Sequence, residues 1–220
     1  MNNFTNQNDI IEAILNGMEK ARKNFLHWTN DRLFLSYAPE KMLSIHIAQE
    51  IANIKNPPEI FIDATVSDIL RCSLKDRKAF LNYMHKNGIK EGVFDITLDE
   101  RFEHKNNNDS ISRVIISVKN GIRSIKEEQL NEIERICKML DPKNTENSSL
   151  DYGVFAFYTD LPFDARKKLD KRIPIFIKSF DTIVEKFPNL KAQYKDRGIK
   201  QLDGVGEWVL STYTITKTRS

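Results

Sequence analysis

The chain has 220 residues and a formal net charge of +3, with 40% hydrophobic and 30% charged residues. This composition supports a buried core for one large domain or two small ones, and it excludes an intrinsically disordered chain. No apolar run reaches the roughly 18 residues of a membrane span, and no secretory signal is recognisable, so we expect a cytoplasmic protein without a membrane partner. Cys72 and Cys137 are too few for a disulfide framework and lack metal-ligand spacing.

The first part of the chain is predicted to be mainly helical. Residues 8–28 place their apolar side chains at helical spacing, which indicates an amphipathic helix. A short strand is predicted at 32–37. A second helix is predicted at 38–54, where a proline in the first turn suits a helix start. Residues 59–64 are a strand candidate, and residues 75–87 are predicted to form a further helix.

Two apolar strands are predicted in the middle of the chain, at 92–98 and 112–119. The polar stretch between them, 99–110, is expected to be an exposed hairpin loop. Residues 125–140 form a helix in this prediction because their apolar side chains fall on one side. Residues 141–150 then read as a polar linker.

The last part of the chain alternates strands and helix. A strand is predicted at 152–158, a mostly helical segment interrupted by Pro174 at 163–187, and a final strand at 207–215. We therefore predict one α/β domain over residues 1–220, whose central mixed sheet of four or five strands is flanked by helices.

Each of the two central strands carries one charged residue, Asp95 or Lys119. Burial of an unpaired carboxylate is costly, so Asp95 should have a metal, a cation or hydrogen-bond donors beside it. On adjacent strands, a carboxylate and a lysine can bind a divalent metal and polarise a phosphate. The plainest alternative is an ion pair between the two strands of a small α/β interaction protein.

These two strands, the helix around 129–136 and the upstream segment 38–48 resemble the PD-(D/E)xK nuclease superfamily. The upstream segment is similar to the first core helix of restriction-endonuclease-like proteins. The resemblance covers about residues 35–160, in the order helix, three strands, helix and strand. It implies a restriction-endonuclease-like core, with the helix and strand of 163–216 packed on it.

The resemblance also implies roles for individual residues. In this superfamily the strand aspartate and the acid of the (D/E)xK element hold Mg²⁺, for which Mn²⁺ can substitute, and the lysine orients the nucleophile and the phosphate. Asp95 would be the metal aspartate and Lys119 the motif lysine. Ser117 stands where the second acid is expected, and a neutral hydroxyl binds magnesium much more weakly than a carboxylate. The implied catalytic residues are Asp95, Lys119, Glu40 and Ser117.

Two explanations account for Ser117. In the first, a glutamate from the following helix replaces the missing acid, as in restriction enzymes that have Ser-x-Lys on the strand. Glu132 and Glu134 are the candidates, and both lie about 100° from the centre of that helix's apolar face, so the geometry prefers neither. In the second, the site is degenerate and the fold serves binding.

The upstream helix adds two further acids, Glu40 and Glu50, which share its apolar stripe when residues are spaced at about 100°. A glutamate that faces inward should be paired or ligating. Glu40 matches the family's helix glutamate better, although an acid in the first turn is also favoured by the helix dipole. The predicted metal ligands are Asp95, Glu40 and Glu132, and Asp63 is a weaker candidate at a strand end.

Basic residues gather in the C-terminal part of the chain, and we expect those of segment 166–172 to bind DNA because a local basic face neutralises phosphates. The alternative is a solvated helix face. The first cluster comprises Arg166, Lys167, Lys168, Lys171 and Arg172, and the second comprises Lys191, Lys195, Arg197 and Lys200.

The predicted function is a metal-dependent endodeoxyribonuclease, in a restriction or phage-defence setting suggested by the family. The alternative is a catalytically degenerate protein of the same fold that binds nucleic acid or a protein partner. A homodimer is possible by analogy with other members of the superfamily.

Overall fold

The computed structural model describes residues 5–30, 33–100, 110–141 and 148–218. The helices, with two short 3₁₀ segments marked η, are α1 (Gln7–Trp28), η1 (Leu35–Tyr37), α2 (Glu40–Ala52), α3 (Val66–Ser73), η2 (Arg77–Ala79), α4 (Phe80–Asn87), α5 (Glu127–Leu140) and α6 (Leu169–Val184). The strands are β1 (Glu59–Thr65), β2 (Val93–Asp99), β3 (Ser112–Lys119), β4 (Tyr152–Pro162), β5 (Leu190–Asp196), β6 (Lys200–Leu202) and β7 (Gly206–Lys217). Each helix of the described residues is too short or too polar to span a bilayer.

The strands form one mixed sheet in the order β1-β2-β3-β4-β7-β5, and β6 pairs with the first residues of β7. β3 and β4 run parallel and are connected through α5, whereas the other neighbouring strands are antiparallel. The predicted α/β class with a mixed sheet is thus confirmed. The predicted count of four or five strands is wrong, because the described residues form seven strands in the sheet. The two unpredicted strands, β5 and β6, have polar sequences, and both pair with β7.

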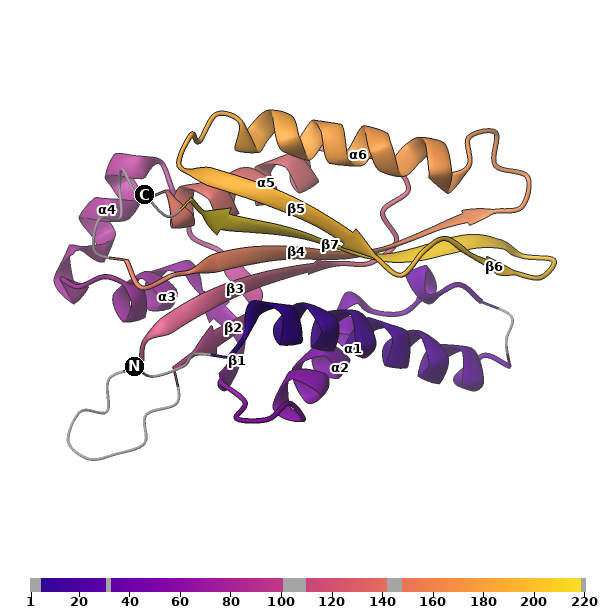
Figure 1. The fold of residues 1–220 in the computed structure, drawn as a ribbon, viewed down its shortest axis with the longest axis horizontal. Coiled ribbons are helices and arrows are strands. Elements are labelled where there is room, and N and C mark those ends of the chain that lie inside the picture. The colour runs from indigo at the N-terminus through magenta and orange to yellow at the C-terminus, as the bar shows by residue number, and fades with distance from the viewer. Residues whose placement is uncertain (1–4, 31–32, 101–109, 142–147, 219–220) are drawn as a thin grey trace.

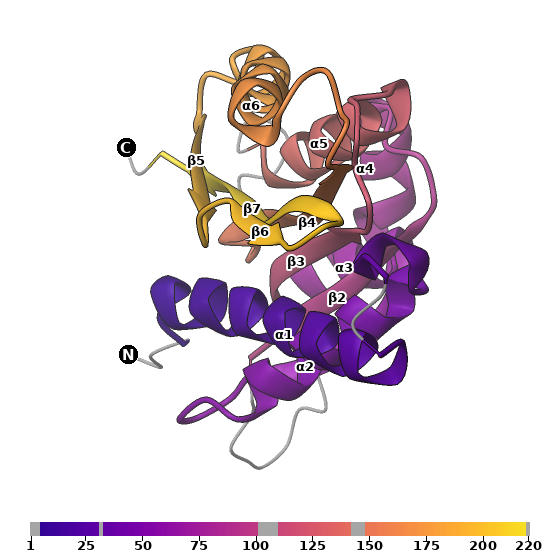
Figure 2. The same ribbon diagram turned by 90° about the vertical axis from the view of Figure 1, so that its right-hand side faces the viewer.

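Helices cover both faces of the sheet (Figures 1 and 2). α1 and α2 pack together on one face, where buried side chains such as Ile14, Leu43 and Ile116 form one apolar cluster. α5 and α6 lie on the opposite face, where Ile133 and Phe180 belong to a second cluster. The central strands β3 and β4 are therefore shielded from water on both sides, as expected for strands whose residues are mostly apolar.

Several local predictions were corrected by tertiary contacts. The strand predicted at 32–37 is wrong, since residues 35–37 form the 3₁₀ segment η1. The helix predicted at 163–187 is shorter, and Pro174 lies inside α6 without ending it. Helix α3 follows β1 directly and was not predicted; Thr65 caps it by accepting the N–H of Asp68. Most of the predicted loop 99–110 and linker 141–150 lies outside the described residues.

Candidate functional site

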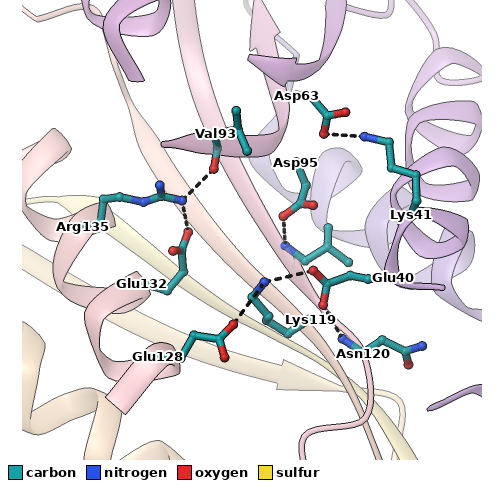
Figure 3. Close-up of polar contacts among 11 residues, drawn as sticks. Glu40, Lys41, Asp63, Val93, Asp95, Lys119, Asn120, Glu128, Glu132 and Arg135 are labelled. Atoms are coloured by element: carbon teal, nitrogen blue, oxygen red, sulfur yellow. Dashed lines mark hydrogen bonds and ion pairs between the residues drawn. The ribbon is translucent and has the colours of Figure 1, made fainter. Parts of the chain in front are cut away.

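β2 and β3 bring Asp95 and Lys119 to the same end of the sheet (Figure 3). The Asp95 carboxylate accepts the backbone N–H of Val118 through Oδ2 at 2.8 Å. This bond fixes the carboxylate against the neighbouring strand, one residue before the lysine. The two charged residues that stood out in the sequence thus occupy one locality.

Glu40 is the first residue of α2 and contacts the end of β3 with both carboxylate oxygens. Its Oε1 lies 2.9 Å from the Lys119 Nζ, and its Oε2 accepts the Asn120 N–H at 3.1 Å (Figure 3). The Asn120 amide in turn donates to the carbonyls of Leu35 and Ala38, at 2.9 and 2.8 Å. Asn120 therefore ties the segment before α2 to the end of β3, which positions Glu40 beside the lysine.

The ionisation of Asp95 reflects a crowded group of acids. Burial raises the pKa of the Asp95 carboxyl, and the charges of Glu40 and Glu132 raise it further. The Val118 N–H and the Lys119 ammonium act in the opposite direction, but they do not cancel the rise in pKa. A cation placed among these carboxylates would relieve the repulsion.

Lys119 remains a cation in this environment. Burial opposes its charge, but the hydrogen bond and negative charge of Glu40, with the charges of Asp95 and Glu132, leave its pKa above the ordinary value. A permanently protonated lysine donates hydrogen bonds and cannot act as a general base at neutral pH.

Of the two glutamates considered on α5, Glu132 is the one whose charge is among the main influences on the pKa values of Asp95 and Lys119. Its carboxylate is oriented by Arg135, at 2.5 Å, and the same guanidinium group donates to the carbonyl of Val93 at 2.8 Å (Figure 3). Glu134 instead pairs with Lys138 on its own helix, at 3.0 Å. Arg135 thus connects α5 to the start of β2 and holds Glu132 on the side of the helix that faces the site.

Sequence reasoning missed Glu128 and Asn120, as well as the cationic residues Arg123, Lys126 and Arg135 of the same site. The Glu128 carboxylate lies 3.8 Å from the Lys119 amine. An acid in the first turn of a helix is common for dipole reasons alone, so no local pattern signals this contact. Asn120 directly follows Lys119, and its role depends on backbone carbonyls that lie more than 80 residues earlier.

Ser117 lies on β3 opposite Phe155 of β4 and is 2% exposed. The position of the expected second acid is therefore buried and uncharged. Two other acids proposed from sequence are engaged elsewhere: Glu50 pairs with Lys20 of α1 at 2.5 Å, and Asp63 forms an ion pair with Lys41 (Figure 3).

A cavity of about 320 Å³ adjoins the end of β3. Its walls include Glu40 and Lys119, together with Arg123, Lys126 and Glu128 from the segment that leads into α5. The lining is predominantly polar, and three of these five side chains are cationic. Such a cavity suits an anionic group better than an apolar one.

The predicted basic segment 166–172 adjoins this cavity through one contact. Arg172 donates to the carbonyl of Arg123 at 2.6 Å, while Arg166 and Lys167 are exposed nearby in sequence. The second basic cluster is arranged differently, because Lys195 and Arg197 both pair with Glu12 of α1. Unlike Lys195 and Arg197, the first cluster therefore offers cations that the described acids of the protein leave largely available.

No group of three or more Asp, Glu, His or Cys side chains within the described ranges is arranged to hold a metal by itself. Comparisons with protein-family models, with curated proteins and with solved structures find no significant match. The function must therefore be inferred from the geometry of the site.

Proposed function

We propose that this protein is a metal-dependent nuclease of the PD-(D/E)xK type that cleaves DNA phosphodiester bonds. The observation that carries the proposal is the ion pair of Glu40 with Lys119 at 2.9 Å beside Asp95, with Glu132 near enough for its charge to act on both Asp95 and Lys119. The chain order α2, β1, β2, β3, α5 and β4 supports it, since the resemblance implies this order, although α3, η2 and α4 are inserted between β1 and β2.

The donor chemistry fits Mg²⁺ when substrate and water are included. Magnesium is commonly held by one or two carboxylates, with waters and substrate phosphate completing six oxygen ligands. Asp95 and Glu132 would supply the carboxylates. Since water and substrate provide the other ligands, a cluster of three neighbouring acids is not required to hold the metal. Both oxygens of Glu40 already accept hydrogen bonds, so its nearest role is to orient Lys119, and metal ligation by Glu40 stays a prediction.

When bound, the metal would stabilise developing negative charge and activate a water molecule. The chain's own residues supply the rest. Lys119 donates to a phosphate oxygen or to the attacking water, and it acts as a fixed cation because Glu40 keeps it protonated. Arg123 and Lys126 line the adjoining cavity, where they would bind flanking phosphates.

The decisive experiment is cleavage of supercoiled, linear, single-stranded and modified DNA in the presence of Mg²⁺ or Mn²⁺. We expect cleavage by the unmodified chain, loss of cleavage in Asp95→Asn, and a reduction of at least about a hundredfold in Glu132→Gln. Glu134→Gln is the matched control on the same helix, because its carboxylate pairs with Lys138, and it should retain activity. Intact DNA under all these conditions, with no metal binding that depends on Asp95, would overturn the proposal.

The second candidate is a catalytically silent protein of the same fold that binds nucleic acid or a protein. The buried, uncharged Ser117 at the position of the expected acid favours it. This candidate predicts DNA binding that needs no metal and survives Lys119→Ala, or a stable protein complex without DNA binding. DNA cleavage that depends on Asp95 would exclude it.

A further inference from the structure

A second cavity, of about 330 Å³, lies between the edge strand β1, helix α3 and the adjoining parts of β2 and β3. Its described lining residues are all distinct from those of the nuclease-like site. Its walls are largely apolar and include Phe61, Ile62 and Ile69, with the Cys72 thiol on the α3 side. The volume falls at the lower end of the range for small-molecule sites, roughly 300 to 1,000 Å³.

Two buried polar side chains of β2, Thr97 and Asp99, belong to the wall of this cavity. Thr97 is 1% exposed and Asp99 is 2% exposed. The Ser110 hydroxyl donates to Oδ2 of Asp99, but Asp99 Oδ1 and Thr97 Oγ1 have no hydrogen-bond partner among the residues that the structure describes. Buried polar atoms in native proteins are nearly always hydrogen-bonded, so two unpaired oxygens on adjacent positions of one strand face require an explanation.

The charged side chains that line the cavity are both acidic. Within the described part of the chain, its lining contains two carboxylates, Asp68 and Asp99, and no Lys, Arg or His. Asp68 is already satisfied, because it accepts from Thr65 at 2.6 Å and from Arg71 at 3.1 Å. Burial raises the pKa of the Asp99 carboxyl despite the hydroxyls of Ser110 and Ser112, so its negative charge is poorly compensated within the protein.

We propose that this cavity binds a small molecule that carries a protonated amine on a compact apolar body. The ammonium donates to Asp99 Oδ1 and Thr97 Oγ1, and the apolar body contacts Phe61, Ile62 and Ile69. An ammonium group fits because it has three donors and no acceptor, and both unpaired oxygens can accept. An anionic ligand is excluded by the two carboxylates, and a neutral alcohol forms weaker hydrogen bonds than a charged donor.

Cys72 provides a test in the unmodified chain, because it lines the cavity and is partly exposed, whereas Cys137 is fully buried in the core. The rate at which a thiol reagent modifies native Cys72 is measured with benzylamine, phenethylamine, cyclohexylamine and hexylamine. The alcohols and carboxylates of the same carbon skeletons serve as controls. We expect at least one amine to slow modification in a saturable way, with little protection by its alcohol and none by its carboxylate.

The Asp99→Asn variant tests the residue on which recognition depends. We expect it to weaken the binding of the protecting amine by about tenfold or more, since a charge-assisted hydrogen bond is removed. Asp68→Asn is the matched control at the same cavity and should change binding by less than about threefold, because surface ion pairs contribute little.

If Asp99→Asn does not fold, the thiol measurement on the unmodified chain decides alone. The inference is overturned if no amine protects Cys72, if alcohols or carboxylates protect equally well, or if a folded Asp99→Asn protein binds the amine unchanged. These outcomes do not depend on nuclease activity, so they test the cavity separately from the function proposed above.

Discussion

At the residue scale, Asp95 is a proposed metal ligand whose partial burial has an energetic cost. Its carboxylate is partly buried, accepts one backbone N–H and lies in the field of Glu40 and Glu132. Burial without full compensation raises its pKa above the ordinary value of 3.8. A perturbed pKa of this kind is typical of functional sites, where a bound ligand can compensate the buried charge.

The raised pKa of Asp95 predicts a pH-dependent change in stability. The folded state binds the Asp95 proton more tightly than the unfolded state, so protonation of Asp95 stabilises the fold. This contribution is fully present below about pH 4, the ordinary pKa of aspartate, and is lost as the pH rises through the raised pKa of the folded state. Asp95→Asn imitates the protonated form. In metal-free buffer, thermal unfolding should therefore give the variant an equal or higher melting temperature at pH 7, with the advantage disappearing near pH 3. An advantage that is independent of pH would contradict this account.

A second residue-scale prediction concerns the ion pair between Arg123 and Asp160. Asp160 is fully buried, and Arg123 donates to its Oδ1 from two nitrogens, at 2.9 and 2.6 Å. Arg123→Ala leaves a buried carboxylate without its cation and should cost about 3 kcal/mol in the free energy of unfolding. Urea denaturation measures this loss, with Arg166→Ala as an exposed control expected to change stability by less than about 0.5 kcal/mol. A loss for Arg123→Ala as small as that of the control would show that Asp160 is stabilised by other groups.

At the element scale, the close approach of α1 and α2 depends on Gly17. A Cβ atom at this position would lie 2.5 Å from Ile47 Cα and 2.7 Å from the His46 carbonyl oxygen. The glycine therefore lets the two helices meet at backbone distance on one face of the sheet, from which α2 presents Glu40 to the site.

Gly17→Ala tests this packing through the sign of its effect. Helix propensity alone predicts a gain of about 1 kcal/mol, whereas the backbone clash predicts a loss of about 1 to 3 kcal/mol. We expect a net loss of stability, measured as a lower melting temperature by circular dichroism. A higher melting temperature would mean that α2 can move away from α1 without cost.

The same scale shows where sequence patterns succeed. β2 and β3 were predicted almost to the residue because continuous apolar runs bounded by polar loops are typical of buried strands. β5 was missed because its sequence, with Lys191, Lys195 and Asp196, is polar for a strand. It forms by pairing with β7 at the edge of the sheet, a partner that local sequence does not specify.

At the scale of the whole molecule, the two basic clusters differ in the groups that they contact. The 166–172 segment adjoins the polar cavity through Arg172, whereas Lys195 and Arg197 neutralise Glu12 of α1. Although the net charge of the chain is near neutral, the cations of the 166–172 segment therefore remain available to phosphates.

This separation predicts the salt dependence of DNA binding. Arg166→Ala combined with Lys167→Ala should weaken binding, and it should reduce the slope of log affinity against log salt by about one for each phosphate that is no longer neutralised. Lys195→Ala is the matched control, since its amine is held by Glu12, and it should leave the slope unchanged. Fluorescence anisotropy across a salt series measures both, and equal effects of the two changes would rule out a specific DNA-binding face.

The sequence by itself determined the α/β class, the two central strands and the unusual positions of Asp95 and Lys119, because these follow from local apolar patterns and the cost of burying charge. Only the tertiary structure decided which acids accompany them. Periodicity placed Glu132 and Glu134 equally far from the core, and the contact of Arg135 with Val93 distinguished them. The tertiary structure also places Glu40, rather than Glu50, beside Lys119. The Asn120 hydrogen bonds that fix the start of α2 join residues far apart in the chain, so local sequence does not specify them.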